Sequence, residues 1–382
     1  MPLHFGTSEF TARISRAQAA LDEAGLDAVL LFAPESHLWL SGYDTFGFAM
    51  FQCMVLGADG RIDLLTRAPD LRQARHTSIL GDDQIHIWTE VEGATPAQDL
   101  ARLLASRGLT GKRIGWETQT PGLTTWNGDM VRAAIPNLIE ASDVIRACRR
   151  VKSSAEIAMH RRAAALSDDA LDAALETTRA GAFEGDILAA MQGAVFKGGG
   201  DYAGNEFILG SGPGALLCRY YSGRRTLDAQ DQLTLEWSGA YARYHAAMMR
   251  TLIVGEASDA QKRMHAAAVE ALEACEAAIR PGDPMGRVFD AHARVLDQHG
   301  LNHARLQACG YGMGAVYNPI WVDFPMFYEG NPLIMQAGQV FFLHMILMDS
   351  DVGLAMCWGH SVLVTEAGVE RLSRSSLDMV AV

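Results

Sequence analysis

The sequence has no apolar run approaching the roughly 20 residues that a membrane-spanning helix needs. Its N-terminus has no basic head followed by an apolar stretch, so we expect no secretory signal peptide. The six cysteines are scattered and form no CxxC pair, which argues against both a disulfide framework and a zinc finger. These absences predict a cytoplasmic protein with free thiols and no membrane partner.

The chain also has too few basic residues to balance its acidic ones. With 45 acidic and 32 basic residues, it carries a formal net charge of -13. An acidic protein repels the phosphate backbone, so nucleic acid is not an expected partner. A small cationic or zwitterionic substrate fits this charge better. At 382 residues the chain is long enough for two hydrophobic cores.

The first part of the sequence alternates between helix and strand patterns. These predicted elements lie at residues 9–24, 27–32, 50–56, 61–65, 96–106, 113–116, 124–134 and 138–141. Alternation of this kind predicts a small α/β domain. A basic stretch at 146–153 then leads into the capping box Ser153-Ser154-Ala155-Glu156, which predicts the start of a long helix. We therefore expect one domain over residues 1–148 and a second over residues 149–382.

Three segments of the second part resemble the creatinase/prolidase family. They read VKSSAEIAMHRRAAAL (151–166), TLEWSGAYARYHAAMMRTLIVG (234–255) and GHSVLVTEAGVERLS (359–373). The resemblance implies an α+β architecture, in which an N-terminal creatinase-like α/β domain precedes a C-terminal pita-bread domain. The pita-bread domain is a curved antiparallel sheet backed by helices.

The same resemblance locates the positions at which the family's metallopeptidases hold two metal ions. An Asp is expected where Glu236 stands, a second Asp at Ala247, a His at Tyr311, a Glu at His344 and a Glu at or beside Gly359. A dinuclear site needs several carboxylates to balance four positive charges, and one remains. We therefore expect no metal and no cofactor. One alternative stays open, a single metal held by Glu236, His344 and the neighbouring His360.

Creatinase and ectoine hydrolase form the metal-free branch of the family, and both hydrolyse C–N bonds. The pattern Glu-x-x-Gly-x-Tyr-x-Arg-Tyr-His at residues 236–245 is similar to that of ectoine hydrolase. Two departures prevent the transfer of either substrate. Arg219 stands where a catalytic His is expected, and Met249 stands where creatinase has a Glu.

Five residues are predicted to be catalytic. A carboxylate in the apolar strand around Glu236 is costly to bury unless it is paired or used, so Glu236 is predicted to act as a general base, a nucleophile or an acid. His245, His344 and His360 are candidates for proton transfer, and Tyr311 for hydrogen bonding to a developing oxyanion. The structural alternatives are an ion pair of Glu236 with an arginine and core histidines with satisfied hydrogen bonds.

Six residues are predicted to contact the substrate. Arg219, with Tyr220 beside it, is predicted to clamp a substrate carboxylate, unless it simply pairs with Glu236. Trp321 is predicted to form a pocket wall. The resemblance implies that a loop with Tyr43, Phe46 and Phe48 completes the active site of a partner subunit, although packing between domains would also explain its aromatic residues.

The sequence thus predicts a homodimeric, metal-independent hydrolase that cleaves a C–N bond of the amidine, guanidino or cyclic amide type in a small polar substrate. A non-catalytic binding module derived from a peptidase is the alternative from another class. A metal-dependent Xaa-Pro peptidase or a lyase of the same fold is the third candidate.

Overall fold

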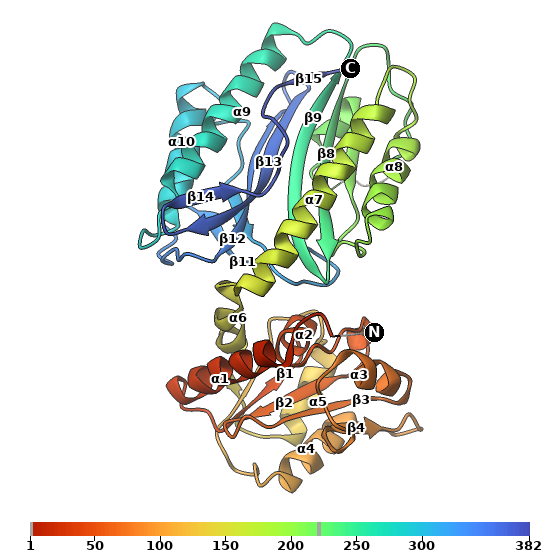
Figure 1. The fold of residues 1–382 in the computed structure, drawn as a ribbon, viewed down its shortest axis with the longest axis vertical. Coiled ribbons are helices and arrows are strands. Elements are labelled where there is room, and N and C mark those ends of the chain that lie inside the picture. Colours follow the sequence, from red (N-terminus) through yellow and green to blue (C-terminus); the bar gives the residue numbers. More distant parts are fainter. Residues whose placement is uncertain (1–2, 220–222) are drawn as a thin grey trace. The chain divides into compact units, whose positions relative to one another are not determined.

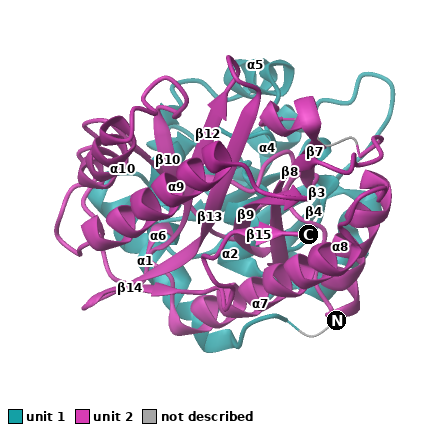
Figure 2. Cartoon of the chain, turned by 90° about the horizontal axis from the view of Figure 1, so that it is seen from above, with its two compact units in different colours: residues 1–149 teal, residues 150–382 magenta. Residues whose placement is uncertain are grey.

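The computed structural model describes residues 3–219 and 223–382, and it divides into two compact units, residues 1–149 and 150–382 (Figures 1 and 2). The division lies one residue from the boundary predicted from the sequence. Tyr220, predicted to contact the substrate, lies outside the described residues. None of the described helices combines the length and the apolar character that crossing a membrane requires.

The first unit is built on a mixed six-stranded sheet with the order β4-β3-β2-β1-β5-β6. Its strands are β1 (Ala28–Leu31), β2 (Cys53–Gly57), β3 (Ile62–Arg67), β4 (Ile85–Trp88), β5 (Ile114–Trp116) and β6 (Ile139–Glu140). Its helices are α1 (Thr7–Glu23), α2 (Pro34–Ser41), α3 (Leu71–Thr77), α4 (Pro96–Ser106), α5 (Thr125–Ala134) and α6 (Ser142–Arg150). Alternate residues of β1 enter two separate apolar cores, with Val29 and Leu31 in one and Leu30 in the other. The predicted α/β alternation is confirmed.

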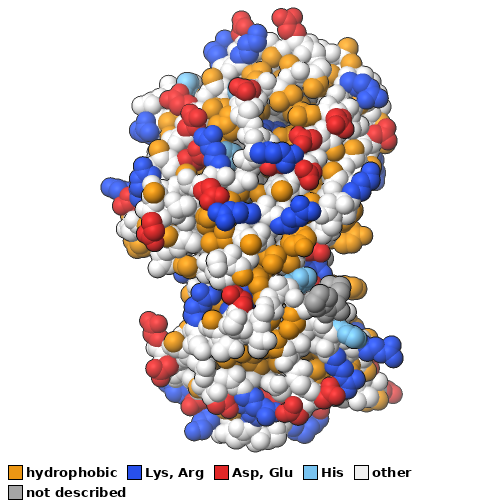
Figure 3. Space-filling model, viewed as in Figure 1, with side chains coloured by type: hydrophobic (Ala, Val, Ile, Leu, Met, Phe, Trp, Pro, Cys, Tyr) orange, Lys and Arg blue, Asp and Glu red, His pale blue; other side chains and the backbone are white. Residues whose placement is uncertain are grey.

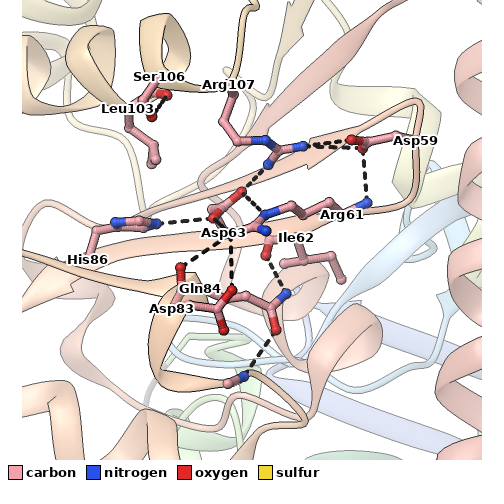
Figure 4. Close-up of polar contacts among 11 residues, drawn as sticks. Asp59, Arg61, Ile62, Asp63, Asp83, Gln84, His86, Leu103, Ser106 and Arg107 are labelled. Carbon is pink, nitrogen blue, oxygen red and sulfur yellow. Dashed lines mark hydrogen bonds and ion pairs between the residues drawn. The ribbon is translucent and has the colours of Figure 1, made fainter.

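A buried carboxylate organises the charges of this unit. The side chain of Asp63 on β3 is fully buried and contacts Arg61, His86 and Arg107 (Figure 4). The contact with His86 Nε2 is 3.0 Å long, and Arg107 also pairs with Asp59 at 3.0 Å. The cluster ties β3 to β4 and to the C-terminal end of α4. Its charged groups are occupied by one another, so we assign it a structural role.

The second unit is built on a nine-stranded sheet with the path β11-β10-β12-β13-β9-β8-β7, in which β14 pairs with β13 and β15 with β9. Its strands are β7 (Ile208–Ser211), β8 (Asp231–Tyr241), β9 (Tyr244–Val254), β10 (Ala308–Gly312), β11 (Asp323–Tyr328), β12 (Val340–Asp349), β13 (Leu354–Thr365), β14 (Gly368–Arg371) and β15 (Val380–Ala381). Its helices are α7 (Ser154–Thr177), α8 (Glu184–Lys197), α9 (Asp259–Ala278) and α10 (Gly286–Gln298). All pairs along this path are antiparallel.

Helix α7 begins at the predicted capping box. The Ser153 hydroxyl accepts the Glu156 backbone N–H at 3.2 Å, and the Glu156 carboxylate accepts the Ser153 N–H at 2.9 Å. The same carboxylate accepts the Tyr244 hydroxyl of β9 at 2.9 Å. The cap therefore starts the helix and also attaches it to the sheet.

Helices α7 and α9 cover the same face of the sheet (Figure 1). Trp237 on β8 donates its indole N–H to Ser167 O of α7 at 3.0 Å, and His360 on β13 contacts Glu276 of α9. Trp237 and His360 both pair with Met248 of β9, so the three residues share one face. Residues on either side of them point to the opposite face, because strand side chains alternate.

Charged side chains are dispersed rather than gathered on the face that Figure 3 shows. On the face drawn in Figure 3, acidic and basic side chains are interspersed across both units. This face shows no basic patch of the kind that binds a polyanion.

Gly239 allows β8 to approach α7 closely. A methyl group at this position would lie 2.1 Å from Ala163 O and 2.7 Å from Ser167 N. The Gly239 N–H is also bound by the Ser167 hydroxyl at 2.6 Å. Both neighbours belong to the helix that backs the sheet, so any side chain must push the two elements apart.

We expect Gly239→Ala to destabilise the second unit by at least about 1–3 kcal/mol, because the overpacked methyl meets backbone atoms. Gly193→Ala in α8 is the matched control, since no atom lies within 4 Å of the added methyl. Its lower backbone entropy when unfolded should stabilise the helix by about 0.5–1 kcal/mol. Urea unfolding measures both changes. Equal midpoints for the two variants would contradict the packing argument.

Candidate active site

One cavity of about 200 Å³ opens on the face of the second unit's sheet opposite α7 and α9. Its polar lining comes from strands that are far apart in the sequence and from a connecting segment. The polar lining residues are Asn205, Arg219, Glu236, Tyr311 and His344. The rest of the wall is apolar and includes Ile208, Ile320, Trp321 and Ile346. The cavity therefore holds few charges within a largely apolar wall.

Strand register brings Glu236 and His344 to the same face. Glu236 of β8 pairs with Met249 of β9, which pairs with Gly359 of β13, which pairs with His344 of β12. Directly opposed residues of antiparallel strands share a face. Gly359 has no side chain, so Met249 carries the only side chain between the two polar ends of this row.

Glu236 is the carboxylate of the cavity and is only 9% exposed. Burial raises its pKa to about 7, although the charge of Arg219 and a hydrogen bond from Tyr311 act in the opposite direction. A carboxyl group that titrates near neutral pH can accept a proton and return it. This property is what general acid–base catalysis requires.

Tyr311 and Trp321 form a hydrogen-bonded pair in the cavity wall. The indole N–H of Trp321 donates to the Tyr311 hydroxyl over 2.8 Å. Burial, together with the nearby Glu236 charge, raises the pKa of Tyr311 well above its ordinary value. Tyr311 is therefore a neutral hydrogen-bond donor at every physiological pH.

His344 is neutral as well. Burial lowers its pKa to about 3. Its ring centroid lies 5.6 Å from that of Tyr311 and 5.5 Å from that of Phe342. Its Nδ1 has no hydrogen-bond partner among the described residues. His344 therefore lines the cavity as an uncharged side chain that is available to bind a polar group of a ligand.

Arg219 supplies the positive charge of the cavity. It follows the short 3-10 helix η4 (Gly212–Leu216) and is exposed. Its charge acts on Glu236, on Cys218 and on Tyr311. The structure thus places the predicted carboxylate clamp beside the predicted base.

The structure does not bring His245 into this cavity. His245 shares the face of Glu236 but lies four residue pairs further along the two strands. Its Nε2 accepts the Gly204 N–H at 2.8 Å, and its Nδ1 lies 2.7 Å from Arg243 O. An acceptor at Nε2 requires the proton on Nδ1, so both ring nitrogens are already used. Its place therefore corresponds to the structural alternative rather than to the predicted catalytic role.

His360 faces the opposite side of the sheet. Its Nε2 lies 2.6 Å from Glu276 of α9, whose carboxylate is also bound by Arg371 at 2.6 Å. The alternation of β13 directs the His360 ring away from the cavity because Gly359 belongs to the cavity face. Glu236, His344 and His360 therefore do not converge, which removes the arrangement suggested for a single metal.

The aromatic loop of the first unit is only partly exposed. Tyr43 is 1% exposed and its hydroxyl accepts a hydrogen bond from Gln52 at 3.1 Å, so it lies within the core of its own unit. Phe48 is also buried, whereas Phe46 is 79% exposed. Of the three predicted residues, Phe46 alone has an exposed side chain.

Sequence reasoning missed Asn205 and Cys218, which both line the cavity. The Asn205 side chain accepts the Trp321 backbone N–H at 3.3 Å and so attaches the 201–205 segment to the cavity wall. The only local signal was the glycine triplet at residues 198–200, which marks a turn but not its destination.

Residues 158–366 match Metallopeptidase family M24, and residues 13–151 match the Creatinase/Prolidase N-terminal domain. The chain belongs to this family. It is 25% identical to ectoine hydrolase of Halomonas elongata, over 97% of this chain and 96% of that protein. It is also 25% identical to the hydrolase/peptidase y4tM of Sinorhizobium fredii, over 99% and 98%. The crystal structure of dipeptidase PepE from Mycobacterium ulcerans superimposes with a TM-score of 0.85 at 24% identity, covering 99% of both chains. The predicted two-domain fold and family are confirmed.

The donor set of this member does not fit the two metal ions that the name of its family implies. Across residues 3–219 and 223–382, no group of three or more His, Cys, Asp or Glu side chains is placed to hold a metal. A Cβ atom at Gly359 would lie 2.4 Å from Leu343 O and 3.0 Å from His344 Cα. This position therefore cannot carry a ligand unless β12 moves away from β13.

The raised pKa of Glu236 predicts a stability cost at high pH. Because the pKa in the folded state exceeds the ordinary value of 4.5, the folded state binds more protons between pH 4.5 and 7. The stabilisation that Glu236 contributes is full below pH 4.5 and is lost as the pH rises through about 7. Unfolding free energies of wild type and Glu236→Gln, measured from pH 4.5 to 8, should diverge by up to about 3 kcal/mol in favour of the variant. A difference that stays constant with pH would contradict the assigned pKa.

Proposed function

We propose that this protein is a metal-independent hydrolase that cleaves a C–N bond in a small polar substrate of the amidine, guanidino or cyclic amide type. The observation that carries the proposal is a solitary carboxylate, Glu236, which titrates near neutral pH in a small cavity beside Tyr311 and His344. The similarity to ectoine hydrolase supports a substrate outside the peptides.

The dimensions and charges of the cavity favour a small dipolar ligand. A volume of about 200 Å³ suits a molecule of amino-acid size rather than a polypeptide. The anionic Glu236 suits a delocalised cation such as an amidinium, and the Trp321 ring offers a face for it. Arg219 suits a carboxylate on the same molecule.

The proposed reaction uses Glu236 as a general base. Glu236 removes one proton from a water molecule as its oxygen bonds to the amidine or amide carbon. Neutral His344 binds the polar atom that gains charge in the tetrahedral intermediate, while the Tyr311 hydroxyl stays beside Glu236. Glu236 then returns the proton to the departing nitrogen as the C–N bond breaks. The products are the free amine and an acid from an amide, an amide from an amidine, or a urea from a guanidino compound.

Two observations weigh against the alternatives. A peptidase of this family needs metal ligands that Ala247, Tyr311 and Gly359 do not provide. A non-catalytic binding module would tolerate a filled cavity, whereas this cavity is open and lined by polar groups of complementary charge.

We also propose that the protein acts as a cytoplasmic homodimer in which each subunit completes the partner's site. The exposed Phe46 supports this, because it lies in the loop that the family resemblance assigns to the partner's site and offers apolar surface that a partner can bury. With Tyr43 and Phe48 buried, Phe46 is the residue that we assign to the contact.

Glu236→Gln tests the catalytic proposal. Removing the base should lower turnover by roughly 10²- to 10⁴-fold while the fold is retained. Ammonia and acid release from ectoine-like, creatine-like and other amidine compounds measures turnover, and elemental analysis with chelator treatment measures metal dependence. The exposed Glu256→Gln is the matched control and should keep full activity. Loss of activity on chelation, or full activity in Glu236→Gln, would overturn the proposal.

Arg219→Met tests the substrate orientation. Losing a charge-assisted hydrogen bond should raise KM roughly 10- to 100-fold for substrates that carry a carboxylate. The carboxamide analogue of the same substrate provides the comparison and should show little change in KM. An equal effect on both compounds would assign Arg219 to the fold of the cavity rather than to carboxylate binding.

A further inference from the structure

The Tyr311 hydroxyl has one proton to donate, and its oxygen accepts one hydrogen bond. An indole N–H can only donate a hydrogen bond, so the 2.8 Å contact with Trp321 makes the Tyr311 oxygen the acceptor. The proton of Tyr311 must therefore point elsewhere. Trp321 is 2% exposed and Tyr311 6%, so bulk water offers little competition for that proton.

Glu236 is the carboxylate that lines the same cavity as Tyr311. Tyr311 acts on Glu236 as a hydrogen-bond donor, which lowers the pKa of this carboxyl. The Glu236 charge in turn raises the pKa of Tyr311, so the phenol retains its proton.

We propose that Trp321 is a positioning residue, whose indole N–H orients the Tyr311 hydroxyl so that it donates to Glu236 and keeps this carboxylate ready to accept a proton. In this arrangement the indole donates a hydrogen bond to the phenol, and the phenol donates one to the carboxylate. Donation to the phenol oxygen also polarises its O–H bond and strengthens the second hydrogen bond. These hydrogen bonds favour the ionised form of Glu236, so that Glu236 acts first as a base and not as an acid.

Trp321 itself is held in place by contacts to its backbone. The Asn205 side chain binds the Trp321 N–H at 3.3 Å, and the neighbouring Gly204 lies so close that a Cβ there would approach the backbone of residues 320 and 321 to within 2.7 Å. This packing fixes the backbone from which the indole extends into the cavity wall. Trp321 needs no contact with the substrate to perform this role.

The protonation of Glu236 in the free protein does not depend on which bond of a substrate is hydrolysed. The test follows the Glu236 carboxyl carbon by NMR across the pH range, after labelling with 13Cδ-glutamate. Glu236→Gln assigns the signal by its loss. Failure of the proposed reaction would leave this titration unchanged, so the two proposals are tested separately.

Trp321→Phe removes the N–H and keeps an aromatic ring. We expect the pKa of Glu236 to rise in this variant, and to rise by about one unit or more in Tyr311→Phe, which removes the direct donor. In the Tyr311→Phe background, Trp321→Phe should add no further shift. An unchanged pKa in Trp321→Phe, or an equal shift with and without Tyr311, would overturn the proposal.

Trp237→Phe is the matched control, since its buried indole N–H also makes one hydrogen bond, to Ser167 O, but on the helix face of the sheet. Trp237→Phe should leave the pKa of Glu236 unchanged. If Trp321→Phe does not fold, benzothienylalanine at position 321 keeps the shape of the indole without its N–H and should give the same rise. In wild type, the Trp321 indole 1H resonance should shift with the Glu236 midpoint and lose this shift in Tyr311→Phe.

Discussion

The antiparallel register of β8, β9, β13 and β12 is the constraint on which the site depends. It places Glu236, Met249, Gly359 and His344 in one row across the face opposite the helices. A shift of one residue in β8 or β12 would turn Glu236 or His344 toward the helix face. The register is secured from behind, where Trp237 and His360 bind α7 and α9. The chemistry of one face is thus maintained by the packing of the other.

Burial then determines how each side chain of the row behaves. Removing a group from water disfavours its charged form. The same apolar wall therefore raises the pKa of Glu236 to about 7 and lowers that of His344 to about 3. Arg219, an exposed residue of the cavity lining, lies beside them. A site with one titrating carboxyl, neutral hydrogen-bonding partners and one cation suits proton transfer during hydrolysis better than it suits the binding of metal ions.

Much of the fold was predictable from the sequence because local patterns determine it. The capping box at Ser153 and Glu156 marked the start of α7, and the alternation of the first part marked an α/β unit. Short elements such as α2, α3 and β4 were missed, since a few residues carry little periodicity. Glu236, Tyr311, His344, Arg219 and Trp321 all line one cavity. The family resemblance supplied the first four positions, and the Gly-rich turn before Trp321 pointed to the fifth.

The sequence by itself determined the chemical groups available to the site, with a single carboxylate where the family's metallopeptidases have several. Only the tertiary structure decided which of three candidate histidines belongs there. His245, His344 and His360 all lie in apolar strands, and nothing local distinguishes them. Strand pairing turns His360 toward Glu276, a hydrogen bond from Gly204 occupies His245, and His344 is left facing the cavity. Which face a strand residue occupies, and what it meets there, depends on segments far away in the chain.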